Sequence, residues 1–175
     1  MSDFWRAGMI ALSAAGAILL VAAGAGHALR WREHRAVLRA HRLLPLASTA
    51  PVAVAATGAE LVVGVTVLVT LLAAPPAAAP PALAQAALYG AFAGYAGVLR
   101  VRRPGVPCGC FGAEAVSWTV VARAVTLAAG SAGCAALGTS APPPERWTYV
   151  AAGAVLAMAT HLLPAWLRPT PDLNP

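Results

Sequence analysis

Five long apolar stretches constrain the fold of this chain more than any other feature of its sequence. They cover about residues 7–29, 51–73, 82–99, 118–137 and 147–167. Each approaches the ~20 residues that an α-helix needs to cross a bilayer. The sequence is 59% hydrophobic and only 10% charged, whereas a soluble domain carries about 25% charged residues.

These stretches predict an all-α fold, a polytopic transmembrane helix bundle of four to five spans. The fifth stretch leaves the number open, because it could instead lie at the periphery of the bundle. Residues 1–169 are predicted to form a single integral membrane domain, and residues 170–175 a disordered tail.

The link over residues 30–46 alternates apolar and basic side chains at roughly helical spacing. The apolar members are Trp31, Val37, Leu38, Leu43 and Leu44, and the basic ones are Arg32, Arg35, Arg39, His41 and Arg42. This pattern predicts a short amphipathic helix lying on the membrane surface after the first span. Such a helix either anchors the chain to anionic lipid or forms a docking surface for a partner protein.

All twelve basic residues are arginines, and they give the chain a net charge of +6. They cluster at the ends of apolar stretches, where arginines anchor helices and set topology, so the basic composition does not indicate nucleic-acid binding. Successive spans alternate in direction, so the link 30–46 and the loop after residue 103 share one face. That face carries most of the arginines, and the positive-inside rule places it in the cytoplasm. Stable disulfides form outside the cytoplasm, so a redox function would instead place this loop on the outer side of the membrane. The two indications conflict, and the side of the membrane stays open.

The loop after the third stretch contains the sequence Cys108-Gly109-Cys110-Phe111-Gly112. Two thiols separated by one glycine lie close enough to exchange electrons with each other or with a partner. A disulfide between them would close a small, strained ring, and strain makes such a bond labile rather than structural. The arginines before the loop favour the thiolate form. We therefore predict a thiol–disulfide relay at the membrane edge, where both a protein partner and a lipid-soluble quinone have access.

Two other interpretations of the cysteine pair stay open. A zinc site needs two ligands beyond two thiolates, and His27, His34 or His41 on the same face could supply them. The spacing matches no familiar zinc pattern, so no metal ligand is assigned. Alternatively, the cysteines are structural, since cysteine often serves as a small apolar side chain. Cys134 lies 16 residues beyond Trp118, or roughly 24 Å along a helix, and we expect it to pack within the membrane.

Two ionisable residues fall inside the apolar stretches, where charge is costly and commonly functional. Glu60 lies nine residues after Pro51, and Arg123 five residues after Trp118. These offsets correspond to depths of roughly 14 Å and 8 Å from the cysteine-loop face. A long arginine side chain spans the difference, so a Glu60–Arg123 pair is geometrically reasonable. It would either handle protons beside the thiols or fix helix packing as a structural ion pair, while His27 is a weaker candidate.

Four of these features occur together in a known family. They are Leu44-Pro45 after the basic link, Glu60-Leu61-Val62-Val63-Gly64, Cys108-Gly109-Cys110-Phe111-Gly112 and Arg123-Ala124. Together they resemble the methylamine-utilisation protein MauE family, in the broader DoxX-like group of redox-associated membrane proteins. The resemblance covers residues 7–137. This chain departs from the family pattern in having Arg123-Ala124 instead of Arg-Asn, and His27 and Arg30 where a lysine is frequent.

The resemblance implies a protein of the bacterial cell membrane that supports maturation of exported enzymes of the methylamine dehydrogenase type. Cys108 and Cys110 would form the redox pair, with Glu60 and Arg123 supporting it from within the bundle. A thioredoxin-like protein is the implied partner and a quinone a candidate electron acceptor, while no cofactor-binding residue is assigned. The sequence also allows a non-catalytic membrane scaffold that docks through residues 30–46, or a small carrier centred on Glu60.

Overall fold

The structure, a computed structural model, describes residues 2–107, 115–139 and 142–166. Its helices are α1 (Ser2–Leu29), α2 (Trp31–His41), α3 (Thr49–Ala73), α4 (Ala79–Arg102), α5 (Trp118–Leu137) and α6 (Pro143–Trp166), with 3-10 turns η1 (Leu46–Ser48) and η2 (Pro75–Ala77). These ranges hold no strand beyond one isolated bridge between Pro107 and Ala115. The predicted all-α class is confirmed. The Cys-Gly-Cys sequence and the tail 170–175 lie outside the described residues.

Four helices within the described residues are long and apolar enough to cross a membrane. They are Asp3–Leu29, Leu46–Ala73, Ala79–Arg102 and Trp118–Leu137. A helix of 24 residues, such as α4, measures about 36 Å and exceeds the ~30 Å hydrocarbon core of a bilayer. The helix α6 covers the predicted fifth stretch and packs along α1. The protein is therefore an integral membrane protein built as a polytopic helix bundle.

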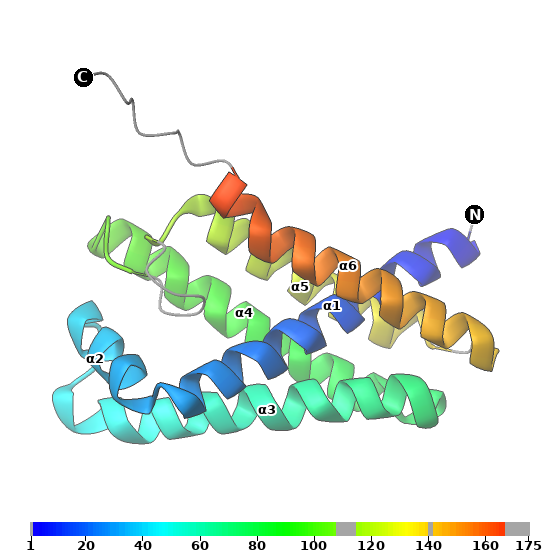
Figure 1. Cartoon of the computed structure of the whole chain (residues 1–175), viewed down its shortest axis with the longest axis horizontal. Coiled ribbons are helices and arrows are strands. Elements are labelled where there is room, and N and C mark those ends of the chain that lie inside the picture. Colours follow the sequence, from blue (N-terminus) through cyan, green and yellow to red (C-terminus); the bar gives the residue numbers. More distant parts are fainter. Residues whose placement is uncertain (1, 108–114, 140–141, 167–175) are drawn as a thin grey trace.

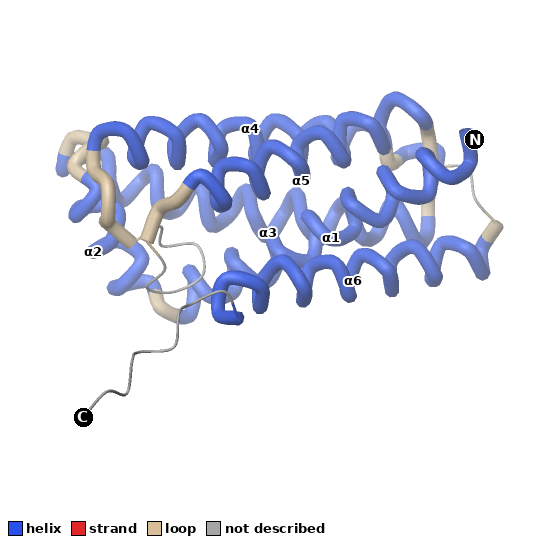
Figure 2. Tube along the Cα trace, turned by 90° about the horizontal axis from the view of Figure 1, so that it is seen from above, coloured by secondary structure: helices blue, strands red, loops and turns tan. Residues whose placement is uncertain are grey.

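The first helix forms the centre of the bundle, packed against α3, α5 and α6 (Figures 1 and 2). Of the most apolar 18 residues of α1, 61% are buried inside the structure. The corresponding share is only 28–33% for the other three candidate spans. The inward positions of α1 are small, and Ala14 and Ala17 are fully buried. Small side chains let helices approach closely in lipid, where association depends on packing rather than on the hydrophobic effect. These residues explain why α1 takes the central place.

Hydrogen bonds between side chains and backbone join α1 to α4 in the middle of the bundle. Gln85 Nε2 donates to the carbonyl of Ser13 at 2.9 Å, and the Tyr89 hydroxyl donates to the carbonyl of Gly16 at 2.8 Å. Gln85 is fully buried. Each such interhelical bond contributes only about 0.6 kcal/mol in membranes, but together they set the register of α4 against α1.

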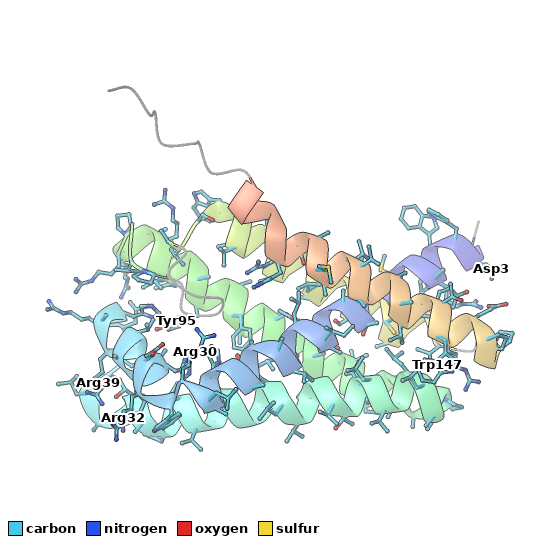
Figure 3. All side chains as sticks on the ribbon, viewed as in Figure 1. Asp3, Arg30, Arg32, Arg39, Tyr95 and Trp147 are labelled. Carbon is cyan, nitrogen blue, oxygen red and sulfur yellow. The ribbon has the colours of Figure 1, made fainter. Side chains whose placement is uncertain are left out.

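The short helix α2 lies at one end of the bundle, and the N-terminus of α1 lies at the other (Figure 1). Arg30, Arg32 and Arg39 are at the α2 end, whereas Asp3 and Trp147 are at the opposite end (Figure 3). Arg32 and Arg39 are exposed. The inward side of α2 carries His34, Val37, Leu38 and His41, spaced as successive positions of one helix face. The predicted amphipathic helix is confirmed.

Candidate functional site

A cavity of about 120 Å³ lies at the α2 end of the bundle, between α1, α2, α3, α4 and α5. Most of its wall is hydrocarbon. Its ionisable lining residues are His27 on α1, His34 and His41 on α2, Glu60 on α3 and Arg123 on α5. Both residues singled out within the spans, Glu60 and Arg123, therefore line the same cavity.

A buried pair of His27 and Glu60 forms part of this wall. His27 Nδ1 lies 2.8 Å from Glu60 Oε2, and the two side chains are only 9% and 3% exposed. The close packing of α1 on α3 brings them together, since a Cβ atom at Gly24 would lie 3.1 Å from Glu60 Cβ. His27 follows Gly24 by about one helical turn. An ionised carboxylate only accepts hydrogen bonds, so in that state the proton of this bond resides on Nδ1.

Arg123 approaches the cavity from α5. Its Nη1 donates to the carbonyl of Thr160 on α6 at 3.3 Å. The sequence predicts a pair between Arg123 and Glu60, but among contacts between described residues Glu60 pairs with His27. The two predicted residues thus share a cavity, and the ionic partner of Glu60 is the histidine that the sequence ranks as weaker.

His34 stacks on His27, with ring centroids 3.9 Å apart and an interplanar angle of 18°. Both nitrogens of the His34 ring are buried, and in the described part of the chain neither has a hydrogen-bond partner. Burial, followed by electrostatic interaction with the His27 and His41 rings, lowers the pKa of His34 to about 4. His34 is therefore neutral near pH 7, with one N–H donor and one acceptor nitrogen left unsatisfied.

His41 joins α2 to α4 and to the loop that follows α4. Its Nδ1 lies 2.8 Å from the Tyr95 hydroxyl, and its Nε2 lies 2.8 Å from the carbonyl oxygen of Pro107. A carbonyl only accepts, so Nε2 carries the proton and Nδ1 accepts from Tyr95. Burial lowers the pKa of His41, which keeps the ring in this neutral form.

The loop between α4 and α5 is described at both of its ends. Pro107 and Ala115 form an antiparallel bridge, and the amide of Val116 donates to the carbonyl of Val106 at 2.9 Å. Val116 also lines the cavity. Cys108 and Cys110 lie between these ends, outside the described residues. The bridge and His41 thus tie both ends of the cysteine segment beside the cavity wall.

Cys134 is a free cysteine, buried in the core with Ile10 and Ala14. It lies on α5, more than four turns beyond Trp118, and packs within the bundle as the sequence predicts. Among the described residues, no group of three or more His, Cys, Asp or Glu is arranged to hold a metal ion.

Three histidines, His27, His34 and His41, belong to the site although their sequence pattern marks them only weakly. His34 and His41 share the helix face of Val37 and Leu38, a signal visible in the spacing of the link. His27 gave a weaker signal, because it stands at the end of an apolar stretch where a polar residue needs no special explanation. Its importance depends on the contact between α1 and α3, which the spacing along one helix does not reveal.

The lowered pKa of His34 predicts a pH dependence of stability. Its ordinary pKa is 6.5 and its folded value about 4, so the unfolded chain binds the proton more readily than the folded chain. The contribution of His34 is complete above about pH 6.5 and is lost as the pH falls towards 4. We expect the unfolding temperature in detergent to fall between pH 7 and pH 5, and to fall less in His34→Leu. Parallel curves for the two proteins would contradict this assignment.

A polytopic helix bundle with a buried ionisable pair in an apolar cavity defines an integral membrane protein with a polar site inside the bundle. The family model described as "Methylamine utilisation protein MauE" matches residues 6–138, which is 133 of 175 residues. The chain belongs to this family of membrane proteins of methylamine utilisation, and the resemblance found in the sequence is confirmed. Comparison with curated proteins and with solved structures gave no significant match.

Proposed function

We propose that this protein is a DoxX-like thiol–disulfide exchange protein of the bacterial cell membrane that supports maturation of exported enzymes. Cys108 and Cys110 are the redox pair, and a thioredoxin-like protein is the partner. Enzymes of the methylamine dehydrogenase type are the clients that family membership suggests.

The observation that carries the proposal is the attachment of the cysteine segment. Pro107 and Ala115, at its two ends, form a bridge, and His41 binds the carbonyl of Pro107. His41 and Val116 also line the cavity that holds the His27–Glu60 pair. The described residues that flank the Cys-Gly-Cys sequence are therefore held together at the wall of a cavity that also contains a buried group able to exchange a proton.

The proposed exchange conserves atoms and electrons. A thiolate of the reduced partner attacks one sulfur of the Cys108–Cys110 disulfide, which forms a mixed disulfide and releases the other cysteine as a thiolate. The second thiol of the partner then attacks the mixed disulfide. The partner leaves as a disulfide, and Cys108 and Cys110 keep the two electrons and take up two protons.

Glu60 and His27 are assigned the proton-handling part of this reaction, with Arg123 as a nearby positive charge. A buried carboxylate and imidazole joined at 2.8 Å can pass a proton between them with little movement. The rate of thiol–disulfide exchange depends on the thiolate fraction, so a nearby proton acceptor is useful. The guanidinium of Arg123 on the same cavity wall favours negative charge there.

The test is trapping of the mixed disulfide between this protein and a purified thioredoxin-like protein. We expect the double replacement Cys108→Ser/Cys110→Ser to abolish the adduct. Either single replacement, Cys108→Ser or Cys110→Ser, should also abolish it, because each removes the disulfide that the partner attacks. Replacement of the partner's second cysteine by serine should make the adduct with the wild-type chain accumulate, because that thiol resolves the mixed disulfide. Cys134→Ala is the matched control and should behave as wild type, since Cys134 is buried in the core. A wild-type level of partner oxidation in the double variant would exclude the relay.

The cavity also favours one alternative function, a small carrier in which Glu60 binds the cargo. Glu60 lines a partly open cavity of about 120 Å³, and a carrier needs such a space to hold its cargo. Under this alternative, Glu60→Gln abolishes transport into vesicles while thiol exchange stays normal. Under the relay, Glu60→Gln slows thiol exchange.

A further inference from the structure

The composition of the cavity wall determines what kind of molecule can occupy it. Of the 21 described residues that line it, fourteen have only hydrocarbon side chains; examples are Leu19, Leu99 and Phe92. The hydroxyls of Tyr89 and Tyr95 are already engaged with Gly16 and His41. A polar or charged solute would lose its hydration against this wall without replacement. The occupant must therefore be mostly apolar.

The size and partial opening of the cavity suit a single ring that is not wholly enclosed. An apolar cavity of about 150 Å³ binds one benzene ring, and this one measures about 120 Å³ and is partly open. Val52 on α3 belongs to its lining and is 37% exposed. A ring with an apolar tail could occupy the cavity and leave its tail in the opening.

The polar groups of the wall require a ring that carries hydrogen-bonding atoms. The two nitrogens of His34 are buried without a described partner, and an unsatisfied buried polar group is unfavourable. His34 is neutral near pH 7 because of its lowered pKa, so it can donate to a carbonyl oxygen. The second torsion of a histidine side chain is broad, and a small rotation presents the N–H to the cavity. Arg123, on α5, offers further donors from a different helix.

We propose that this cavity binds the head-group ring of a lipid-soluble quinone, with His34 donating a hydrogen bond to one carbonyl oxygen. The inference deepens the proposed function by naming its electron acceptor, and for that purpose it rests on the proposed function. Reoxidation of the Cys108–Cys110 dithiol releases two electrons and two protons. A quinone takes up both pairs to become a hydroquinone, and the dithiol becomes a disulfide.

The test compares two six-membered rings with the same four methyl groups, one of which carries two carbonyl groups where the other carries two C–H groups. Purified protein in lipid nanodiscs is titrated with tetramethyl-1,4-benzoquinone and with 1,2,4,5-tetramethylbenzene, and the rise in unfolding temperature gives the affinity of each. Wild-type protein should bind the quinone more tightly than the hydrocarbon. In His34→Leu the quinone should bind about five- to tenfold more weakly, as expected for one lost hydrogen bond, while the hydrocarbon should bind no more weakly.

Three variants make the result specific. His34→Gln keeps a donor and an acceptor and should restore part of the preference for the quinone, which also guards against a folding defect in His34→Leu. Ala124→Leu, in the cavity wall, should weaken binding of both rings. Val62→Leu is the matched control, because Val62 is 66% exposed and does not belong to the lining, and it should bind both rings as wild type does.

Equal affinity of wild type for the two rings would overturn the proposal and identify a site for hydrocarbon only, such as a lipid tail. Absence of binding by either ring would overturn it as well. An undiminished quinone preference in His34→Leu would overturn the assignment of His34. The double variant Cys108→Ser/Cys110→Ser should still bind the quinone, so failure of the relay and failure of quinone binding are separate results.

Discussion

Replacement of His27 by leucine is expected to destabilise the bundle by about 3–5 kcal/mol, the usual effect of removing one partner from a buried ion pair. Glu60 is only 2% exposed, and His27 is its ionic partner at 2.8 Å. Without that imidazole, the carboxylate stays in an apolar environment with its ionic contact removed. The measurement is unfolding of the purified protein in detergent by heat or by a denaturing surfactant.

The double variant His27→Leu/Glu60→Leu distinguishes a structural pair from a functional one. Replacing both partners by apolar residues of similar size is often neutral or stabilising, so we expect the double variant to recover most of the stability lost in His27→Leu. If the pair handles protons, the double variant is stable and yet impaired in thiol exchange. Full exchange activity in a stable double variant would instead assign the pair to helix packing alone.

The architecture follows closely from hydropathy, because a span must be long and apolar whatever surrounds it. The five predicted stretches coincide with α1, α3, α4, α5 and α6. The helices run beyond the apolar stretches, and α4 continues to Arg102. Hydropathy reports where the hydrocarbon core could lie, whereas a helix continues until its backbone hydrogen bonds end. The amphipathic helix α2 was equally predictable, since one of its sides faces the bundle and the other does not.

Which helix contacts which was not predictable in the same way. In lipid, the outward face of a helix is as apolar as its packed face, so the periodicity that marks the buried face of a soluble helix is weak. The central position of α1 and the contact of Gly24 with Glu60 both depend on packing. The depths of Glu60 and Arg123 along their helices, counted from the cysteine-loop face, indicated that the two residues lie close together, and both line one cavity. These depths carry no information on rotation about the helix axis, and rotation decides that Glu60 meets His27.

Replacement of Gly64 by alanine should separate α1 from α3 and destabilise the protein by about 1–3 kcal/mol, the range for overpacking a filled contact. A Cβ atom at this position would lie 2.8 Å from Val21 Cγ2 and 2.9 Å from the carbonyl oxygen of Ala17. Since one of these atoms belongs to the backbone, a side-chain rotation cannot relieve the contact and the helices must move. Gly64→Leu should be worse, and unfolding of the purified variants in detergent gives the order.

The matched control lies on the same helix. A Cβ atom at Gly58 would meet nothing within 4 Å, so Gly58→Ala should be neutral or stabilising by up to ~1 kcal/mol through helix propensity. The difference between the two variants isolates the packing effect from the effect of glycine itself. Glu60 precedes Gly64 by one turn, so the shift that Gly64→Ala forces on α3 must also lengthen the His27–Glu60 contact. Gly64→Ala should therefore slow thiol exchange although it alters no ionisable group. If Gly64→Ala is unstable and yet exchanges thiols at the wild-type rate, the reaction does not need His27 and Glu60 to lie 2.8 Å apart.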